Sequence, residues 1–128
     1  MVTVWVNGCF DVVHRGHIEL LQYAKSKGDR LIVGIDTDER VKASKGPFRP
    51  YNSAKDRKFF LESIRYVDEV VTYGTNEELE NHLIDNSVNI MIIGSDWKGK
   101  EIIGQHCCKQ LMFFDRIGTY STTKILEG

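Results

Sequence analysis

The sequence has almost no net charge, because 17 lysines and arginines are offset by 18 aspartates and glutamates over 128 residues. The two signs are scattered along the chain, so no patch indicates binding to nucleic acid or to a membrane surface. No uninterrupted apolar run approaches the length of a membrane span, and the first residues lack the charged and apolar regions of a signal peptide. This balance favours a small charged metabolite as the partner.

Cysteine is also scarce, and two of the three cysteines, Cys107 and Cys108, are adjacent. An odd number in this arrangement does not indicate a disulfide framework, so we expect a reducing, cytoplasmic location. A hydrophobic content of 41% over 128 residues is enough for one core of ordinary size. The length therefore predicts a single domain covering residues 1–128.

Apolar, β-branched segments recur along the chain and alternate with helical patterns. Strands are expected at residues 2–6, 30–36, 67–73, 88–94 and, more weakly, 110–114. This alternation predicts an α/β fold, a Rossmann-like doubly wound sheet of about five parallel strands with helices on both faces. Ligands of such folds bind at the carboxyl ends of the strands.

Helical spacing of apolar residues accounts for the segments between these strands. The first helix is expected to include residues 18–25, a second to start at Ser53 with Asp56 as its capping partner, and a third to be capped by Asn76. Residues 37–51 hold glycine, prolines and several cations and are expected to form a loop.

The tetrapeptide His-Arg-Gly-His at residues 14–17 is expected where the first strand passes into the first helix. The unpaired N–H groups of a first helical turn and the positive end of the helix dipole favour an anion there. Gly16 lets the backbone come close to that anion, while His14 and His17 can donate to phosphate oxygens. The segment therefore predicts a phosphate site.

These residues and their neighbours resemble the signature of the small cytidylyltransferases within the HxGH nucleotidyltransferase superfamily. The resemblance rests on Gly8, Phe10, Asp11, His14, Gly16 and His17 in that spacing. Residues 64–70, Trp97 and the segment from Arg116 through residues 121–124 are similar to the glycerol-3-phosphate cytidylyltransferases. Residues 7–11, 45–52 and 101–104 are instead similar to the heptose-1-phosphate adenylyltransferase domain.

The resemblance implies transfer of a nucleoside monophosphate from a nucleoside triphosphate to a small phosphorylated substrate, with release of pyrophosphate. We expect CTP and glycerol-3-phosphate, giving CDP-glycerol for wall and capsule polymers, because the C-terminal and Trp97 segments lie where the nucleotide should bind. The alternatives are ATP with heptose-1-phosphate, which gives ADP-heptose for lipopolysaccharide, and a non-catalytic nucleotide sensor on the same fold. A homodimer and Mg²⁺, held mainly by the triphosphate, are also implied.

Roles carried over from the family make His14, His17, Lys45 and Arg116 catalytic, and give Lys45, Arg57 and Arg65 the substrate phosphate. Arg57 and Arg65 are expected on one helix, near the same face. The expected nucleotide-binding residues are Gly8, Cys9, Phe10, Asp11, Gly16, Asp96, Trp97, Arg116, Ser121, Thr122 and Thr123.

Several simpler interpretations stay open at this stage. Asp11 could be a turn former rather than a participant in binding the metal nucleotide, and Arg57, Arg65 and Lys45 could be solvated surface residues. A zinc site combining the two histidines of residues 14–17 with His106 or Cys107 has poor ligand spacing, so no protein metal site is predicted. The loop after Arg116 departs from the family pattern, which leaves its detailed contacts open.

Overall fold

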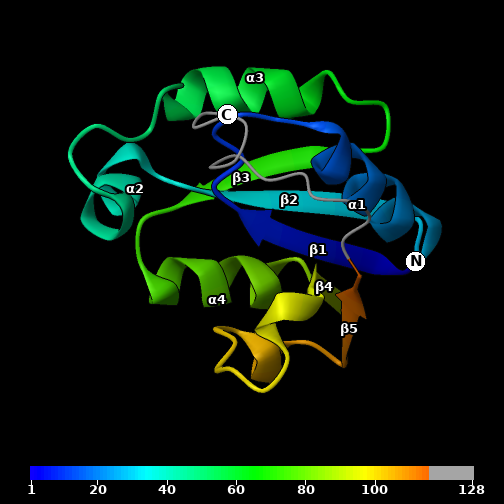
Figure 1. Cartoon of the computed structure of the whole chain (residues 1–128). Helices are drawn as coiled ribbons and strands as arrows, with labels where there is room; N and C mark the ends of the chain where they lie inside the picture. Colours follow the sequence, from blue (N-terminus) through cyan, green and yellow to red (C-terminus); the bar gives the residue numbers. More distant parts are fainter. Residues whose placement is uncertain (116–128) are drawn as a thin grey trace.

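The computed structural model describes residues 1–115, which form a single five-stranded sheet with helices around it (Figure 1). All strand pairs are parallel, and the spatial order is β3-β2-β1-β4-β5. The strands are β1 (Thr3–Gly8), β2 (Arg30–Asp36), β3 (Glu69–Tyr73), β4 (Ile90–Gly94) and β5 (Gln110–Phe114). The chain moves outward from β1 to β3 and then returns to the other side of β1, so the direction of winding reverses between β1 and β4. Such a reversal opens a crevice at the carboxyl ends of the strands.

Helices cover both faces of the sheet, as the sequence predicted (Figure 1). They are α1 (Arg15–Ser26), α2 (Asp38–Lys45), α3 (Ala54–Glu62) and α4 (Asn76–Asp85), with short 3₁₀ turns η1 (Ser95–Trp97) and η2 (Gln105–Cys107). Leu21 of α1 and Leu61 of α3 join the core on one face, whereas Leu83 of α4 joins the core on the other. Within residues 1–115, none of the helices combines the length and the apolar character needed to cross a membrane.

Two strands have the predicted bounds, the inner strand β2 and the edge strand β5. β2 is buried on both faces from Leu31 to Ile35 and so carries a continuous apolar signal. Ser53 caps α3 as predicted, and its side chain accepts a hydrogen bond from the N–H of Asp56. The first helix begins at Arg15, three residues before the predicted segment, and includes Gly16 and His17.

Two local predictions were wrong. Residues 37–51, expected to be a loop, contain the helix α2, which starts because the Thr37 hydroxyl accepts from the N–H of Arg40 while Asp38 occupies the first turn. The cap of α4 is Thr75 rather than Asn76, and its hydroxyl accepts from the N–H of Glu78 at 3.1 Å. In both cases a threonine directly before the helix does the capping.

Gly34 in the middle of β2 is set by the packing of large rings over the sheet. A Cβ atom at this position would collide with the six-membered ring of Trp5 and would lie 3.1 Å from Cε1 of Tyr73. Trp5 is fully buried, and its indole N–H donates to the side chain of Asn7 at 2.9 Å. Gly34 therefore leaves room for the Trp5 ring, and Trp5 in turn orients Asn7 near the end of β1.

We expect Gly34→Ala to lower the free energy of unfolding by about 1–3 kcal/mol, because the added methyl group overpacks a filled core. Urea denaturation followed by far-UV circular dichroism measures this change. Gly74→Ala is the matched control, since its added Cβ would meet neighbours only at ordinary contact distances, 3.4 Å and beyond. Equal stability of the two variants would contradict the packing argument.

Candidate active site

A cavity of about 530 Å³ lies at the carboxyl ends of the strands. The last residue of every strand lines it, namely Gly8, Asp36, Tyr73, Gly94 and Phe114. Parallel strands end at the same edge of a sheet, so this edge collects side chains that lie far apart in the sequence. The cavity is therefore at the position that the fold prediction assigned to the ligand.

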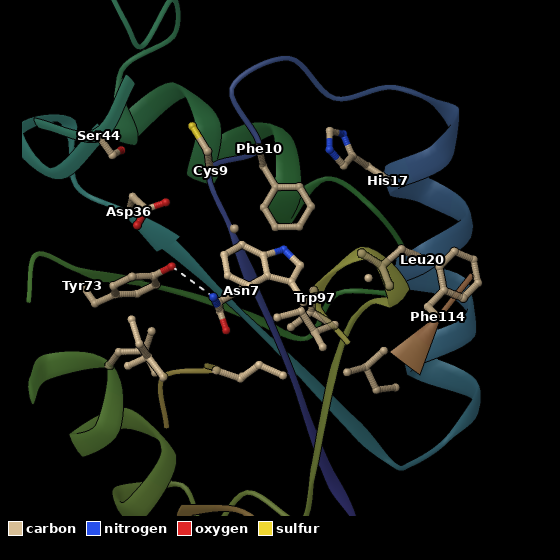
Figure 2. A pocket seen from close by; sticks show the side chains of 18 of the residues that line it. Asn7, Cys9, Phe10, His17, Leu20, Asp36, Ser44, Tyr73, Trp97 and Phe114 are labelled. Atoms are coloured by element: carbon tan, nitrogen blue, oxygen red, sulfur yellow. Dashed lines mark hydrogen bonds between the residues drawn. The ribbon is translucent and has the colours of Figure 1, made fainter. Parts of the chain in front are cut away.

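Most of the predicted site residues in the described part of the chain meet in this cavity. Figure 2 shows Cys9, Phe10, His17 and Trp97 around it, together with residues from the other strand ends. The predicted residues that line it are Gly8, Cys9, Phe10, His14, Gly16, His17, Lys45 and Trp97. The HxGH segment, α2 and η1 thus contribute to one site.

The two histidines form a reciprocal cap at the start of α1. Nδ1 of His14 accepts a hydrogen bond from the N–H of Gly16 at 3.1 Å, and Nδ1 of His17 accepts from the N–H of His14 at 3.2 Å. This is a capping box built from imidazoles in place of the usual hydroxyl and carboxylate. The local sequence therefore holds both side chains in fixed orientations at the helix N-terminus.

This cap also determines which ring nitrogen carries the proton. A nitrogen that accepts a hydrogen bond is unprotonated, so in the neutral rings of His14 and His17 the proton is on Nε2. The two rings stack with centroids 3.8 Å apart and planes 21° apart. Each ring consequently has an Nε2–H donor, which is the group that a phosphate oxygen requires.

The ring of Phe10 packs against the ring of His17. Its ring centroid lies 4.9 Å from that of His17, and the residue is 95% buried although it lines the cavity. Its backbone has φ of +50°, a left-handed conformation that is strained for a bulky residue. Gly8 allows this arrangement, because a Cβ there would lie 3.2 Å from the Phe10 ring. The turn after β1 is therefore shaped to bring the ring under His17.

Cys9 lines the cavity as a neutral thiol. Burial raises its pKa, and the positive charges of Lys45 and Arg57 only partly offset that effect. A protonated thiol is a poor nucleophile. Cys9 therefore contributes shape and not covalent chemistry.

Asp11 does not line the cavity, because its side chain holds the segment before α3. The carboxylate accepts hydrogen bonds from the N–H groups of Tyr51 and Asn52, both at 2.9 Å, and from Nε of Arg49 at 3.0 Å. Burial opposes ionisation of this carboxyl group, but these hydrogen bonds outweigh it and lower its pKa. The geometry favours the turn-forming interpretation of Asp11 and gives it a positioning role, whereas its predicted nucleotide contact stays a prediction.

Arg57 is fully buried and binds protein acceptors. It donates from Nε to the carbonyl of Asn52 at 3.1 Å, from Nη1 to the carbonyl of Cys9 at 2.9 Å and from Nη2 to the carboxylate of Asp38 at 2.8 Å. It is not among the residues that line the cavity. In this structure Arg57 is a positioning residue that joins the turn after β1, α2 and α3.

The expectation that Arg57 and Arg65 share one helix was wrong. α3 ends at Glu62, and Arg65 lies beyond it as an exposed residue whose guanidinium stacks on Tyr66 and donates to its hydroxyl at 3.0 Å. The apolar spacing of the segment continued past the true end of the helix, which misled the prediction. The phosphate-binding roles of both arginines stay predictions.

The remaining predicted residues are not placed at the cavity. Asp96 belongs to η1, which directly follows the carboxyl end of β4, as the sequence indicated. Its side chain is not among the groups that the structure describes. Arg116, Ser121, Thr122 and Thr123 lie outside the described residues, 1–115.

Sequence reasoning missed several polar residues that line the cavity. They are Asn7, Asp36, Arg40, Ser44 and Tyr73, and the segment 101–103 adds Glu101, Ile102 and Ile103. Two of them could have been found from their position, because Asp36 and Tyr73 are the last residues of predicted strands, where ligands of this fold bind. The helix α2, which carries Arg40 and Ser44, was itself missed.

Within residues 1–115, the ligands of the alternative zinc site are not brought together. In the part of the chain that the structure describes, the possible metal ligands that cluster are Glu80, His106 and Cys107, which lie within 4.8 Å of one another. That group includes neither His14 nor His17. The two histidines of the HxGH segment instead line the cavity.

We expect the charge of Asp11 to matter for stability in a pH-dependent way. Asp11→Asn should lower the free energy of unfolding at pH 7 by about 1–3 kcal/mol, because hydrogen bonds to a charged acceptor are lost. Since the pKa of Asp11 is lower in the folded protein, the carboxylate contributes fully above its unfolded pKa of about 3.9 and loses its contribution as the pH falls through the folded value.

The difference between wild type and Asp11→Asn should therefore shrink from pH 5 downward in urea denaturation. Asp85→Asn, at the exposed end of α4, is the control and should differ little from wild type at any pH. A stability difference for Asp11→Asn that is constant with pH would show that the carboxylate charge is not responsible.

Comparison with known proteins identifies the family. A model of the family described as cytidylyltransferase-like matches residues 5–127. The chain is 42% identical over 124 residues to the bifunctional protein HldE of Nitratiruptor and 41% identical over 125 residues to that of Helicobacter pylori. Each alignment covers 97% of this chain but 27% of the relative, so the chain spans about a quarter of the length of these curated relatives.

A solved structure supports the same assignment. The lipopolysaccharide core biosynthesis protein of Thermoplasma volcanium superposes with a TM-score of 0.74 at 25% identity, covering 94% of this chain and 99% of that one. The family match, the parallel sheet and the paired histidines at the helix start agree with the resemblance found in the sequence. This chain belongs to the cytidylyltransferase-like family of nucleotidyltransferases.

Proposed function

We propose that this chain transfers AMP from ATP to the phosphate group of heptose-1-phosphate and releases pyrophosphate. The observation that carries the reaction type is the pair of Nε2–H donors of His14 and His17, fixed at a helix N-terminus inside the cavity. The relatives support the choice of nucleotide and acceptor.

In this reaction an oxygen of the acceptor phosphate attacks the α-phosphorus of ATP, and the bond from that phosphorus to the bridging oxygen of pyrophosphate breaks. The protein need supply no covalent intermediate, since alignment and stabilisation of the developing negative charge account for most of the catalysis. The two imidazoles and the N-terminal dipole of α1 supply fixed donors to the phosphate oxygens. Lys45, at the end of α2, adds a positive charge at the cavity.

The comparisons favour the adenylyltransferase over the cytidylyltransferase for glycerol-3-phosphate that we expected from the sequence. The bifunctional HldE relatives contain the heptose-1-phosphate adenylyltransferase domain that residues 7–11, 45–52 and 101–104 resemble. All three segments contribute directly to the cavity, through residues 8–10, through Lys45 and through residues 101–103. The expectation of CTP was based on the C-terminal segment and on Trp97. The C-terminal segment lies beyond residue 115, whereas Trp97 lines the cavity and can pack on either nucleobase.

The described residues fit a magnesium ion that is bound mainly through the triphosphate. The Glu101 carboxylate lines the cavity, and Mg²⁺ usually takes one or two carboxylates together with substrate phosphates and waters. When bound, the ion would neutralise charge on the phosphates. The part of this chain is then to hold the nucleotide: Trp97, which is 46% exposed at the cavity, can pack on the base, and Asp96, Arg116 and residues 121–123 are proposed to complete the nucleotide site.

The activity itself is tested by pyrophosphate release with ATP, CTP, GTP and UTP, each combined with heptose-1-phosphate or glycerol-3-phosphate. We expect release with ATP and heptose-1-phosphate at least tenfold faster than with any other pair. Release with CTP and glycerol-3-phosphate alone would overturn the proposal in favour of the cytidylyltransferase. Nucleotide binding without turnover on any acceptor would instead support the sensor.

His17→Ala should reduce kcat by about 100-fold or more, because it removes a donor to the transition state and also half of the imidazole cap. His106→Ala is the matched control, since that histidine is exposed and belongs to the separate cluster beside α4. Thermal melts of both variants show whether the fold is retained. Unchanged turnover by a folded His17→Ala protein would exclude the catalytic role.

A further inference from the structure

The two sides of the cavity differ in chemistry (Figure 2). In that view His17, Leu20 and Phe114 lie on one side, and Asp36, Tyr73 and Asn7 lie on the other. The first side combines the phosphate donors with apolar surface from α1, β4 and β5, whereas the second is built from polar groups at the ends of β1, β2 and β3. Because the reaction needs two substrates, the two sides can each take one.

The polar side is fixed by a chain of hydrogen bonds that begins in the core. The buried Trp5 indole donates to Oδ1 of Asn7 at 2.9 Å, and Nδ2 of Asn7 donates to the Tyr73 hydroxyl at 3.4 Å. Tyr73 is 98% buried, and burial together with the negative charge of Asp36 raises its pKa, so it is a neutral phenol. Asn7 and Tyr73 therefore form a rigid base for the groups around them.

Asp36 and Arg40 form the accessible part of this side. Nε of Arg40 donates to Oδ1 of Asp36 at 3.0 Å, and Nη2 donates to Oδ1 of Asn76 at 2.8 Å. The Arg40 guanidinium lies 5.2 Å from the centre of the Tyr73 ring, which holds it over the aromatic face. The side chains of Asp36 and Arg40 are 20% and 25% exposed, so both are held in place and still reach the cavity.

The charge of this pair indicates what it can bind. Asp36 and Arg40 neutralise each other, so the pair is a weaker phosphate site than the histidines or Lys45. It nevertheless has both acceptors and donors to offer, because a carboxylate has about four acceptor positions, and hydrogen bonds with Arg40 and Tyr73 leave some of them open. Neutral hydroxyl groups use donors and acceptors together, whereas a nucleobase packs better against the apolar side with Trp97.

We propose that Asp36 and Arg40, held in place by Asn7 and Tyr73, form the acceptor subsite and bind hydroxyl groups of a polyhydroxylated phosphate monoester, that is, a sugar phosphate. This inference rests on the proposed nucleotidyltransferase function. The acceptor phosphate then extends toward Lys45, which follows Ser44 on the same helix and lines the same cavity. Asp36 and Arg40 are specificity residues in this assignment, and Asn7 and Tyr73 are positioning residues.

Steady-state pyrophosphate release with ATP and heptose-1-phosphate tests the subsite. We expect Asp36→Asn and Arg40→Gln each to raise the KM for heptose-1-phosphate by about 10-fold to 100-fold, which is the effect of losing hydrogen bonds to a charged group. The KM for ATP should change less than about twofold, and so it also reports that the variants are folded. Glu39→Gln, exposed on the same helix and outside the cavity lining, is the matched control and should leave both constants unchanged.

A second acceptor separates hydroxyl recognition from a general effect on the site. Ethyl phosphate has the attacking phosphate but no hydroxyl groups, so wild type and Asp36→Asn should use it equally poorly. If the variant loses as much with ethyl phosphate as with heptose-1-phosphate, or if the KM for ATP rises in parallel, the subsite assignment is wrong.

Failure of the proposed function gives a different pattern. If wild type releases no pyrophosphate with any sugar phosphate, the enzymatic proposal fails, and the subsite is judged by calorimetric titration of heptose-1-phosphate and mannose-1-phosphate into wild type and Asp36→Asn. Binding that is lost in the variant supports the subsite. Equal binding, or none to wild type, overturns it.

Discussion

The turn between β1 and α1 is held by hydrogen bonds along its whole length, and the site depends on this constraint. Arg57 holds the carbonyl of Cys9 at the start of the turn, Asp11 fixes its middle to residues 49–52, and the imidazole of His17 holds the N–H of His14 at its end. None of these contacts involves a ligand. The donors of α1 are therefore oriented before any substrate arrives, which is the condition for electrostatic catalysis.

This arrangement explains why a charged side chain is buried so completely. Burying an arginine completely is unfavourable unless its charge is paired and its nitrogens donate to acceptors. Each of the three side-chain nitrogens of Arg57 donates one hydrogen bond, two of them to carbonyls and one to the Asp38 carboxylate. The same three contacts connect the turn to α2 and α3. The helix that carries Lys45 is thus fixed relative to the histidines through Arg57, although the two segments are about 30 residues apart in the sequence.

How far the sequence predicts this structure depends on how local each feature is. The strand β2 and the histidine pair were predictable, because a buried strand and a short motif carry their own signal within a few residues. The burial of Arg57 was not, since its acceptors come from three separate segments and nothing in its own helix distinguishes it from a solvated arginine. The helix α2 was missed because the glycine and prolines after it dominate the composition of residues 37–51.

The reaction type is likewise easier to predict from the sequence than the acceptor substrate. The two histidines that we propose as donors to the phosphates lie within one short motif, residues 14–17, so the motif indicates the reaction type, and the family comparison agrees with it. The groups on the opposite side of the cavity come from the ends of three strands and from α2, and no short motif contains them. If Asp36 and Arg40 bind the acceptor as proposed, a chain can keep the nucleotidyltransferase signature while its acceptor changes through single substitutions at positions such as 36 and 40. Neither position belongs to the segments of this sequence that resemble one or the other enzyme of the family, so the acceptor has to be inferred from the arrangement of side chains in space.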